Sequence, residues 1–216
     1  MKTLTKEMQT AITPVMALDI LKKGNDRFVN NLKANRNLLQ QANETSDGQH
    51  PFAVILSCID SRTSAELIFD QGLGDVFSIR IAGNIINEDI LGSMEFGCKV
   101  AGAKIIVVLG HTKCGAVKGA CDHVEMGSLT ALLSKIQPAV YDEKSVLENR
   151  NSGNADFVEK VAVINVKRTV HAVIERSPIL KEMIEKGEIG IVGGTHDLSS
   201  GMVTFYEDTL IVNNLN

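Results

Sequence analysis

Short stretches rich in apolar residues recur along the chain and predict buried strands. They lie at 52–56, 76–80, 104–109 and 188–192, and a further strand at a sheet edge is expected at 202–206. Between them, apolar residues at helical spacing predict helices over 65–70, 88–100, from about residue 114, over 156–176 and over 178–186. Strands that alternate with helices predict an α/β fold with a mostly parallel β-sheet flanked by helices.

The first fifty residues precede this alternation and have a different pattern. A helix is expected to start at Thr13-Pro14, because proline at the first helical position has no amide hydrogen to lose. Apolar positions from 15 to 32 follow helical spacing with an interruption at Gly24-Asn25, which predicts one or two amphipathic helices. The polar residues 40–50 predict a loop, and 138–154 predict a surface excursion. We expect a single domain over 1–216, with 1–50 as an N-terminal helical arm and loop.

Residue types that bind metals follow two of the predicted strands. The strand at 52–56 leads into Cys58, and the strand at 104–109 leads into His111 and Cys114. Because ligands of open parallel sheets bind outside the carboxyl ends of the strands, these side chains meet if the two strands are neighbours. Two thiolates and an imidazole in tetrahedral geometry favour zinc. The sequence therefore predicts a zinc ion held by Cys58, His111 and Cys114.

Two charged residues follow Cys58 closely. Three protein ligands leave a fourth position open, which is typical of catalytic zinc. Asp60 can accept a hydrogen bond from zinc-bound hydroxide, or it can swing in as a fourth zinc ligand and close the site. Arg62 can hold Asp60 off the metal by charge-assisted hydrogen bonds, so we expect Asp60 and Arg62 to be catalytic. A structural zinc with a permanent fourth protein ligand, and a plain ion pair between Asp60 and Arg62, stay open as alternatives.

Composition narrows the class of protein. The formal net charge is −4 and the pI is near 5.7, which argues against nucleic-acid and anionic-membrane partners, since these need basic surfaces. No apolar run is long enough to span a bilayer, and the polar start lacks the apolar stretch of a signal peptide, so a cytoplasmic location is expected. In that reducing compartment the four cysteines are predicted to be free thiols or metal ligands.

The motifs around the predicted ligands closely resemble those of the β-class carbonic anhydrases. That family carries Cys-x-Asp-Ser-Arg followed by His-x-x-Cys-Gly, and this chain has both, at 58–62 and 111–115. The stretches 75–84, 93–96 and 191–201 are also similar, and the order of elements fits from about Pro14 to Tyr206. The resemblance implies reversible hydration of CO₂ to bicarbonate and a proton, with zinc hydroxide as the nucleophile. It also implies homodimers or homotetramers, in which the N-terminal helices embrace the partner subunit.

The chain departs from the family pattern at a few positions. Ile59 stands where serine is common, and Ile81 where asparagine is common. Family members with a closed resting site build a bicarbonate pocket from a Trp–Arg–Tyr trio, but this chain has no tryptophan. Ile55 takes the expected Trp position and His196 stands near the usual Tyr. We therefore predict an open site at neutral pH, with the carboxylate of Asp60 held by Arg62.

Two other functions are compatible with the same residues. Hydrolysis of carbonyl sulfide or carbon disulfide suits the same zinc hydroxide, because these molecules are linear like CO₂. Outside enzymology, the alternative is a non-catalytic module that zinc stabilises and that binds a partner or senses bicarbonate. The proton shuttle stays unassigned among His50, His123 and His196.

Overall fold

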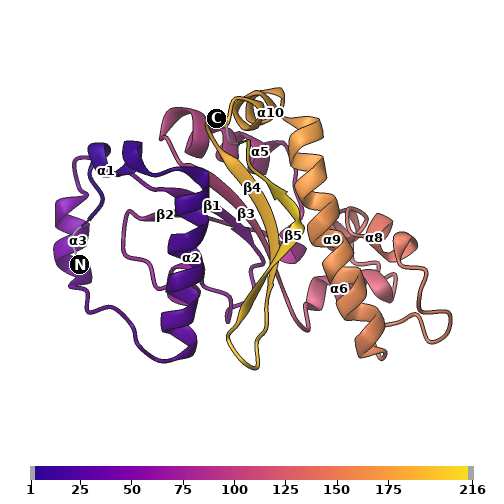
Figure 1. The fold of residues 1–216 in the computed structure, drawn as a ribbon. Coiled ribbons are helices and arrows are strands. Elements are labelled where there is room, and N and C mark those ends of the chain that lie inside the picture. Colours follow the sequence, from indigo (N-terminus) through magenta and orange to yellow (C-terminus); the bar gives the residue numbers. More distant parts are fainter. Residues whose placement is uncertain (1–2, 214–216) are drawn as a thin grey trace.

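A five-stranded sheet forms the centre of the computed structural model, which describes residues 3–213 (Figure 1). Its strands are β1 (Ala53–Ser57), β2 (Val76–Arg80), β3 (Ile105–His111), β4 (Gly190–His196) and β5 (Val203–Ile211). The order across the sheet is β2-β1-β3-β4-β5, and only β5 is antiparallel to its neighbour. The predicted α/β class with a mostly parallel sheet is confirmed, and β5 is longer than expected.

The strands β1 and β3 are parallel neighbours, as the predicted metal site requires. Ala53 pairs with Ile105 and Ser57 pairs with Leu109, so the two strands end at the same edge. Every residue of both strands is buried, because helices cover both faces of the sheet. The apolar character of these two strands, apart from Ser57 and His111 at their ends, therefore follows from their central position.

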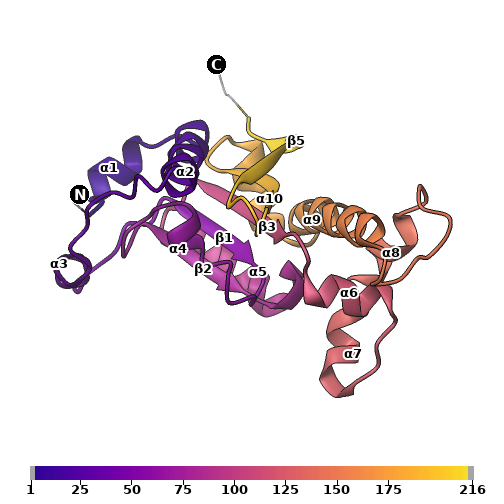
Figure 2. The ribbon, with the colours of Figure 1, turned by 90° about the horizontal axis from the view of Figure 1, so that it is seen from below.

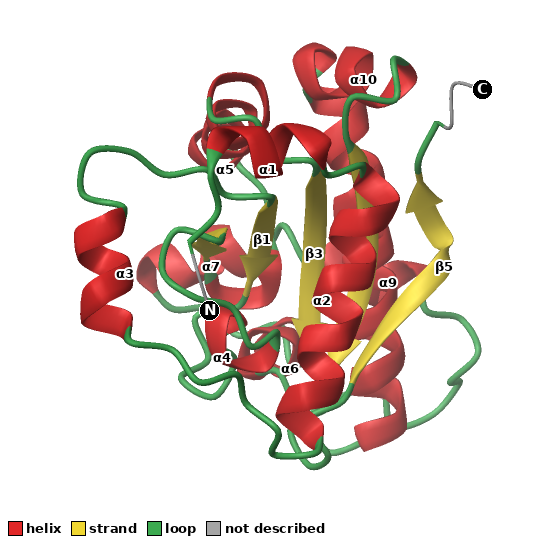
Figure 3. Cartoon of the chain, turned by 60° about the vertical axis from the view of Figure 1, so that its left-hand side comes forward, coloured by secondary structure: helices red, strands yellow, loops and turns green. Residues whose placement is uncertain are grey.

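Helices lie on both faces of the sheet, as Figure 3 shows. One face is covered by α2 (Pro14–Val29) and α4 (Ala65–Ile68), and the other by α5 (Glu88–Glu95), α9 (Ala155–Arg176) and α10 (Pro178–Glu185). α1 (Lys6–Ala11) and α3 (Leu38–Glu44) belong to the N-terminal region. After β3, the short helices α6 (Gly115–Cys121), α7 (Gly127–Leu133) and α8 (Gln137–Asp142) pack with the start of α9 into a lobe (Figure 2).

One expectation for the N-terminal region is wrong, and an open one is decided. A loop is expected at 40–50, but α3 occupies its first half and begins after Asn37, whose side chain accepts a hydrogen bond from the Gln40 amide. Of the one or two helices expected across Gly24-Asn25, the structure has one, because α2 continues through both residues. A glycine is required there by close packing, since a Cβ atom on Gly24 would lie 1.8 Å from the carbonyl oxygen of Phe69.

Smaller differences concern two other segments. The helix expected at 88–100 is α5 followed by a π-helical turn at Phe96–Val100. The surface excursion expected at 138–154 begins inside α8. The apolar side of α2 covers this chain's own sheet, where Ala17, Leu18 and Leu21 are buried, and the expected contact of the N-terminal helices with a partner subunit stays a prediction. Within residues 3–213, no helix is both long and apolar enough to cross a membrane.

Candidate metal centre

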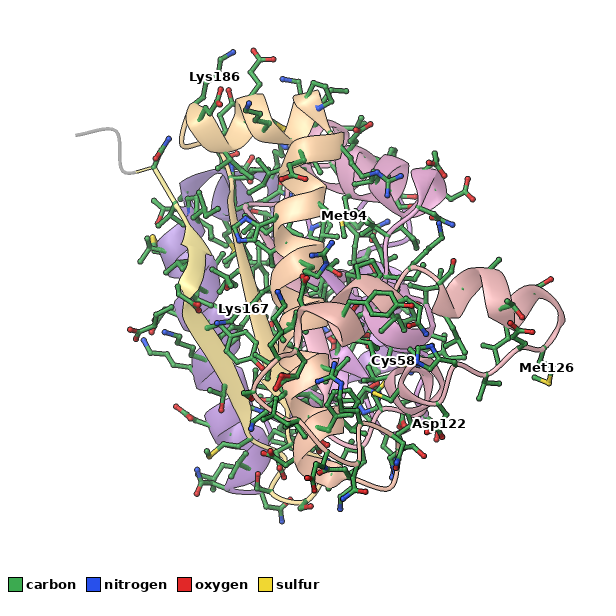
Figure 4. All side chains as sticks on the ribbon, turned by 90° about the vertical axis from the view of Figure 1, so that its right-hand side faces the viewer. Cys58, Met94, Asp122, Met126, Lys167 and Lys186 are labelled. Atoms are coloured by element: carbon green, nitrogen blue, oxygen red, sulfur yellow. The ribbon has the colours of Figure 1, made fainter. Side chains whose placement is uncertain are left out.

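The three predicted metal ligands come together at the carboxyl edge of the sheet. Cys58 follows β1, His111 ends β3, and Cys114 immediately precedes α6. Their donor atoms all lie within 4.8 Å of one another, and no other such group of metal-binding side chains occurs in residues 3–213. All three side chains are buried, and Figure 4 shows Cys58 at the base of the α6–α8 lobe.

The donor geometry fits a tetrahedral zinc ion. The sulfur atoms of Cys58 and Cys114 are 4.0 Å apart. Two sulfurs that are each about 2.3 Å from zinc, at the tetrahedral angle, would be about 3.8 Å apart. Nδ1 of His111 lies 2.9 Å from the carbonyl oxygen of Thr112. Because a carbonyl oxygen can only accept a hydrogen bond, Nδ1 is the nitrogen that carries the proton. Nε2 of His111 is buried without a hydrogen-bond partner among the described residues, so its lone pair is available to a metal.

A backbone amide supports the Cys58 sulfur. The amide of Gly83 donates to Cys58 Sγ over 3.4 Å, and the carbonyl oxygen of Gly83 accepts from Asn165 on α9. Gly83 has a positive φ of 69°, and a Cβ atom there would lie 2.5 Å from Ile136 and 3.2 Å from Ala116. Glycine is therefore needed for both the backbone conformation and the close approach to the lobe.

The turn between His111 and Cys114 is fixed by contacts from distant residues. Lys113 has a φ of 59°, and its amide donates to Oε1 of Glu159 on α9 over 2.7 Å. The amide of Thr112 donates to the carbonyl oxygen of His196 in β4 over 3.0 Å. Because the turn is tied to both α9 and β4, the two ligands on it are held in place by the folded core.

Arg62 holds the carboxylate of Asp60. The backbone amide and Nε of Arg62 donate to Oδ1, at 2.9 and 3.0 Å, and Nη2 donates to Oδ2 at 2.8 Å. The hydrogen bonds from Arg62 keep the pKa of Asp60 well below its usual range, and Asp60 in turn raises the pKa of Arg62. The Asp60 side chain is only 16% exposed, and it is not part of the group of donors within 4.8 Å. The structure therefore has Asp60 on Arg62 rather than among the metal-binding side chains.

The segment from Cys58 to Asp60 is anchored to β2. Arg80 donates from Nε to the carbonyl oxygen of Cys58 over 3.1 Å and from Nη2 to that of Asp60 over 2.6 Å. The hydroxyl of Thr63 donates to the same carbonyl of Asp60 over 2.9 Å. The backbone that carries the ligand and the carboxylate is therefore positioned independently of the Arg62 side chain.

The thiols and the imidazole perturb one another. A hydrogen bond from Cys114 stabilises the thiolate of Cys58 and lowers the pKa of Cys58 to about 4, with further help from His111 and the Gly83 amide. The same hydrogen bond, together with burial, raises the pKa of Cys114. Burial alone would lower the pKa of His111, but the Cys58 thiolate and the other neighbours outweigh burial and raise it. A thiolate is thus already favoured at the position where a metal would need one.

An apolar pocket of about 290 Å³ opens beside the metal-binding group. It is lined by Cys58, Ile59, Asp60, Ala82, Gly115, Ala116, Gly119, Leu129 and Leu133. The pocket exists because the α6 residues that line it have small side chains or none, and leucines of α7 form another wall. The pocket can therefore hold a small apolar molecule beside the Asp60 carboxylate.

Comparisons with known proteins agree with this site. A family model described as carbonic anhydrase matches residues 53–203, a span that contains all three metal-binding residues. The chain belongs to the β-carbonic anhydrase family. Membership makes it an enzyme of the carbonate dehydratase type, as predicted from the motifs.

Curated relatives and solved structures support the same family. Carbonic anhydrase 2 of Mycobacterium tuberculosis is 39% identical over 200 residues, which cover 87% of this chain and 90% of the relative. The carbonic anhydrase of Mycolicibacterium smegmatis is 36% identical, covering 88% and 92%. The structure of the β-carbonic anhydrase CcaA matches with a TM-score of 0.70 and 25% identity, covering 91% and 99%. A Sordaria macrospora β-carbonic anhydrase described as tetrameric matches with a TM-score of 0.68 and 22% identity, covering 78% and 90%.

Other residues singled out by the sequence lie around this β-carbonic anhydrase site or away from it. His196 pairs in register with His111 and is 3% exposed, and neither ring nitrogen has a hydrogen-bond partner among the described residues. Ile55 is buried inside β1, whereas Ile59 is 60% exposed at the pocket. Cys98 and Cys121 are buried free thiols outside the metal-binding group. His123 is exposed and lies beside the Tyr141 ring.

Sequence reasoning missed two residues that hold the site together. Glu159 supports the Lys113 amide from 46 positions away, and no local pattern connects the two. Asn165 supports Gly83 from 82 positions away. The glycine itself stands in the Ala82-Gly83-Asn84 turn that the family resemblance identified, so only its partner could not be found.

Proposed function

We propose that this β-carbonic anhydrase catalyses the reversible hydration of CO₂ to bicarbonate and a proton, with zinc held by Cys58, His111 and Cys114. The observation that carries the proposal is the convergence of three buried donors beside an apolar pocket that Asp60 also lines. Zinc with three protein ligands supplies, at its open fourth position, a bound water acidic enough to become the attacking hydroxide. The family of the curated relatives supports the same reaction.

Asp60 and Arg62 are proposed as the catalytic pair. Oδ1 of Asp60 accepts two hydrogen bonds from Arg62, whereas Oδ2 accepts one, so Oδ2 can accept a further hydrogen bond from the reacting oxygen and orient it. Arg62 keeps Asp60 ionised and away from the thiolates. Asp60 as a fourth metal ligand belongs to the closed alternative, and its bonds to Arg62 favour the open one.

The pocket supplies a place for the substrate. CO₂ is small and has no net dipole, so walls made of Ile59, Leu129 and Leu133 favour its entry over that of water. Bicarbonate carries a charge that these walls do not neutralise, which favours its departure after the reaction.

CO₂ hydration and zinc content, measured on the same sample, test the proposal. We expect about one zinc per chain, with hydration by stopped flow that strengthens as the pH rises from 6.5 to 9. One zinc per chain without hydration at pH 8–9 would point to a structural zinc or a non-catalytic module and would overturn the proposal. Sulfide release from carbonyl sulfide is assayed in parallel, although no observation on the site favours that substrate over CO₂.

Self-association is proposed as well. The homodimer or homotetramer implied by the family resemblance is supported by the description of the Sordaria macrospora neighbour as tetrameric. Light scattering coupled to size-exclusion chromatography would give the mass of the assembly. The predicted absence of nucleic-acid and membrane partners and the predicted cytoplasmic location stay predictions.

A further inference from the structure

A second pocket lies between the lobe and α9, away from the apolar pocket at the metal centre. We call it the α8–α9 pocket. It has a volume of about 230 Å³ and is lined by Ile85, Ile86, Lys135, Pro138, Asn165, Arg168, Thr169, Ala172 and Arg176. It shares none of its lining residues with the pocket beside Cys58. A ligand of this pocket would therefore not compete directly for the substrate space.

Three cationic side chains line the α8–α9 pocket, and no carboxylate from residues 3–213 lines it. Lys135, Arg168 and Arg176 contribute the positive charges. Arg168 forms an ion pair with Asp142, and Arg176 forms one with Glu88 at 2.9 Å. Neither carboxylate lines the pocket, and the side chains of Asp142 and Glu88 are 49% and 87% exposed. Lys135 makes no ion pair within the described part of the chain. In a chain of net charge −4, this concentration of positive charge is local and specific.

Two lining residues of the pocket, Asn165 and Thr169, are polar and buried. Asn165 is 3% exposed and Thr169 is 6% exposed, and both side chains lie one helical turn apart on α9. Asn165 uses one N–H of Nδ2 on the carbonyl oxygen of Gly83 over 2.9 Å, which leaves its second N–H for another acceptor. The Thr169 hydroxyl is also a hydrogen-bond donor. Buried neutral donors and cationic side chains in one lining are what a small oxyanion needs for recognition.

We propose that the α8–α9 pocket binds a small tetrahedral or trigonal oxyanion, of the size of inorganic phosphate or bicarbonate. Arg168 and Arg176 can each donate two parallel hydrogen bonds to such an anion, whereas Lys135 contributes a point charge. The Thr169 hydroxyl and the second N–H of Asn165 add two neutral donors. This binding site is separate from the CO₂ site and does not depend on the proposed hydration reaction.

Titration of the zinc-loaded protein with inorganic phosphate, followed by amide chemical shifts in NMR, tests the proposal. We expect saturable binding of one anion with a dissociation constant on the order of 1 mM, and shifts concentrated at 85–86, 135 and 165–176. A second titration with bicarbonate decides which of the two anions the pocket prefers. Shifts confined to the metal-binding loops at 58–62 and 111–115 would mean that the anion binds the zinc, and would overturn the proposal.

Variants separate this pocket from general charge effects. Lys135→Gln removes a cation that has no ion-pair partner among residues 3–213, so the fold should be unaffected, and phosphate affinity should fall about tenfold. Arg168→Gln should weaken binding at least as much. Lys181→Gln on α10 removes the same charge outside the lining residues and should leave the affinity unchanged. Equal phosphate affinity in the wild type and in Lys135→Gln would contradict the proposal.

Discussion

The guanidinium of Arg62 clamps both carboxylate oxygens of Asp60, although the two residues are only two positions apart. The clamp stabilises the ionised form and keeps the pKa of Asp60 well below its usual range. Asp60 is therefore a carboxylate at every pH at which the enzyme would be assayed. Any pH dependence of turnover between pH 6 and 9 must come from another group.

Removing the charge of Asp60 should abolish most of the activity without removing the metal. Asp60→Asn keeps the size of the side chain but replaces one acceptor oxygen by a donor, so it can no longer orient the reacting oxygen. We expect CO₂ hydration to fall about 100-fold or more, with unchanged zinc content. Asp156→Asn breaks an exposed pair with Lys160 and is the matched control, with wild-type activity expected. Asp60→Asn with full activity would show that the pair is only an ion pair at a strand end.

Loss of a metal ligand should affect the metal and the fold together. Cys58→Ser replaces a thiolate by a hydroxyl that binds zinc poorly, so we expect loss of zinc and a fall of at least about 5 °C in the midpoint of thermal unfolding. The control is Cys98→Ala, because Cys98 is also buried but lies outside the metal-binding group, and burial raises the pKa of its thiol to about 12. It should keep one zinc per chain. Zinc retention by Cys58→Ser would mean that the metal lies elsewhere.

Glu159 should act as a positioning residue for the metal. Glu159→Ala removes the acceptor of the Lys113 amide, which loosens the left-handed turn between His111 and Cys114. We expect zinc to dissociate to a chelator about tenfold faster. Glu175→Ala, an exposed residue on the same helix, should leave the rate unchanged. Identical zinc release from the two variants would indicate that the turn holds its shape without Glu159.

Asp70 should make stability depend on acid pH. Burial alone would raise the pKa of Asp70, but hydrogen bonds from Arg27, the Ala34 amide and Arg36 outweigh burial. The pKa of Asp70 in the folded protein therefore lies below the unfolded value of about 3.9. The stabilisation is therefore full above about pH 4 and is lost as the pH falls through the folded pKa. Asp70→Asn leaves two arginines without their carboxylate and should cost about 3 kcal/mol at pH 7 in urea unfolding.

The pH dependence distinguishes this effect from a packing defect. The difference in unfolding free energy between the wild type and Asp70→Asn should shrink as the pH is lowered below 4. Asp19→Asn breaks an exposed pair with Lys23 and should change stability little at any pH. A difference that stays constant from pH 7 to pH 3 would contradict a role for the ionised carboxylate.

The metal centre was more predictable from sequence than the surroundings that support it. Buried parallel strands are nearly all apolar, so β1 and β3 stand out in the sequence, and the rule that ligands gather at carboxyl ends places Cys58 beside His111 and Cys114. Helix α3 was missed because its residues are mostly polar, and only the Asn37 cap marks its start. Gly24-Asn25 was interpreted as a break from local propensity, whereas the close approach of Phe69 decides the conformation there.

Long-range support escaped prediction for a physical reason. From α9, which follows β3, Glu159 reaches the metal-binding loop at Lys113 and Asn165 reaches the turn at Gly83, and their spacing on α9 carries no signal of these contacts. Two polar side chains on an amphipathic helix are expected to face solvent. The contacts become visible only when the packing of α9 against the sheet is known.

The neighbouring position of β1 and β3 also has a consequence for how the protein folds. The two ligand-bearing segments are 111 − 58 = 53 residues apart, and the chain completes α4, β2 and α5 before it returns to lie beside β1. An unfolded chain would have to close that long loop before one ion could reach all three donors, at a considerable cost in chain entropy. Metal uptake should therefore follow the pairing of β1 with β3, and the rate at which a refolding chain captures zinc would report when the centre of the sheet is complete.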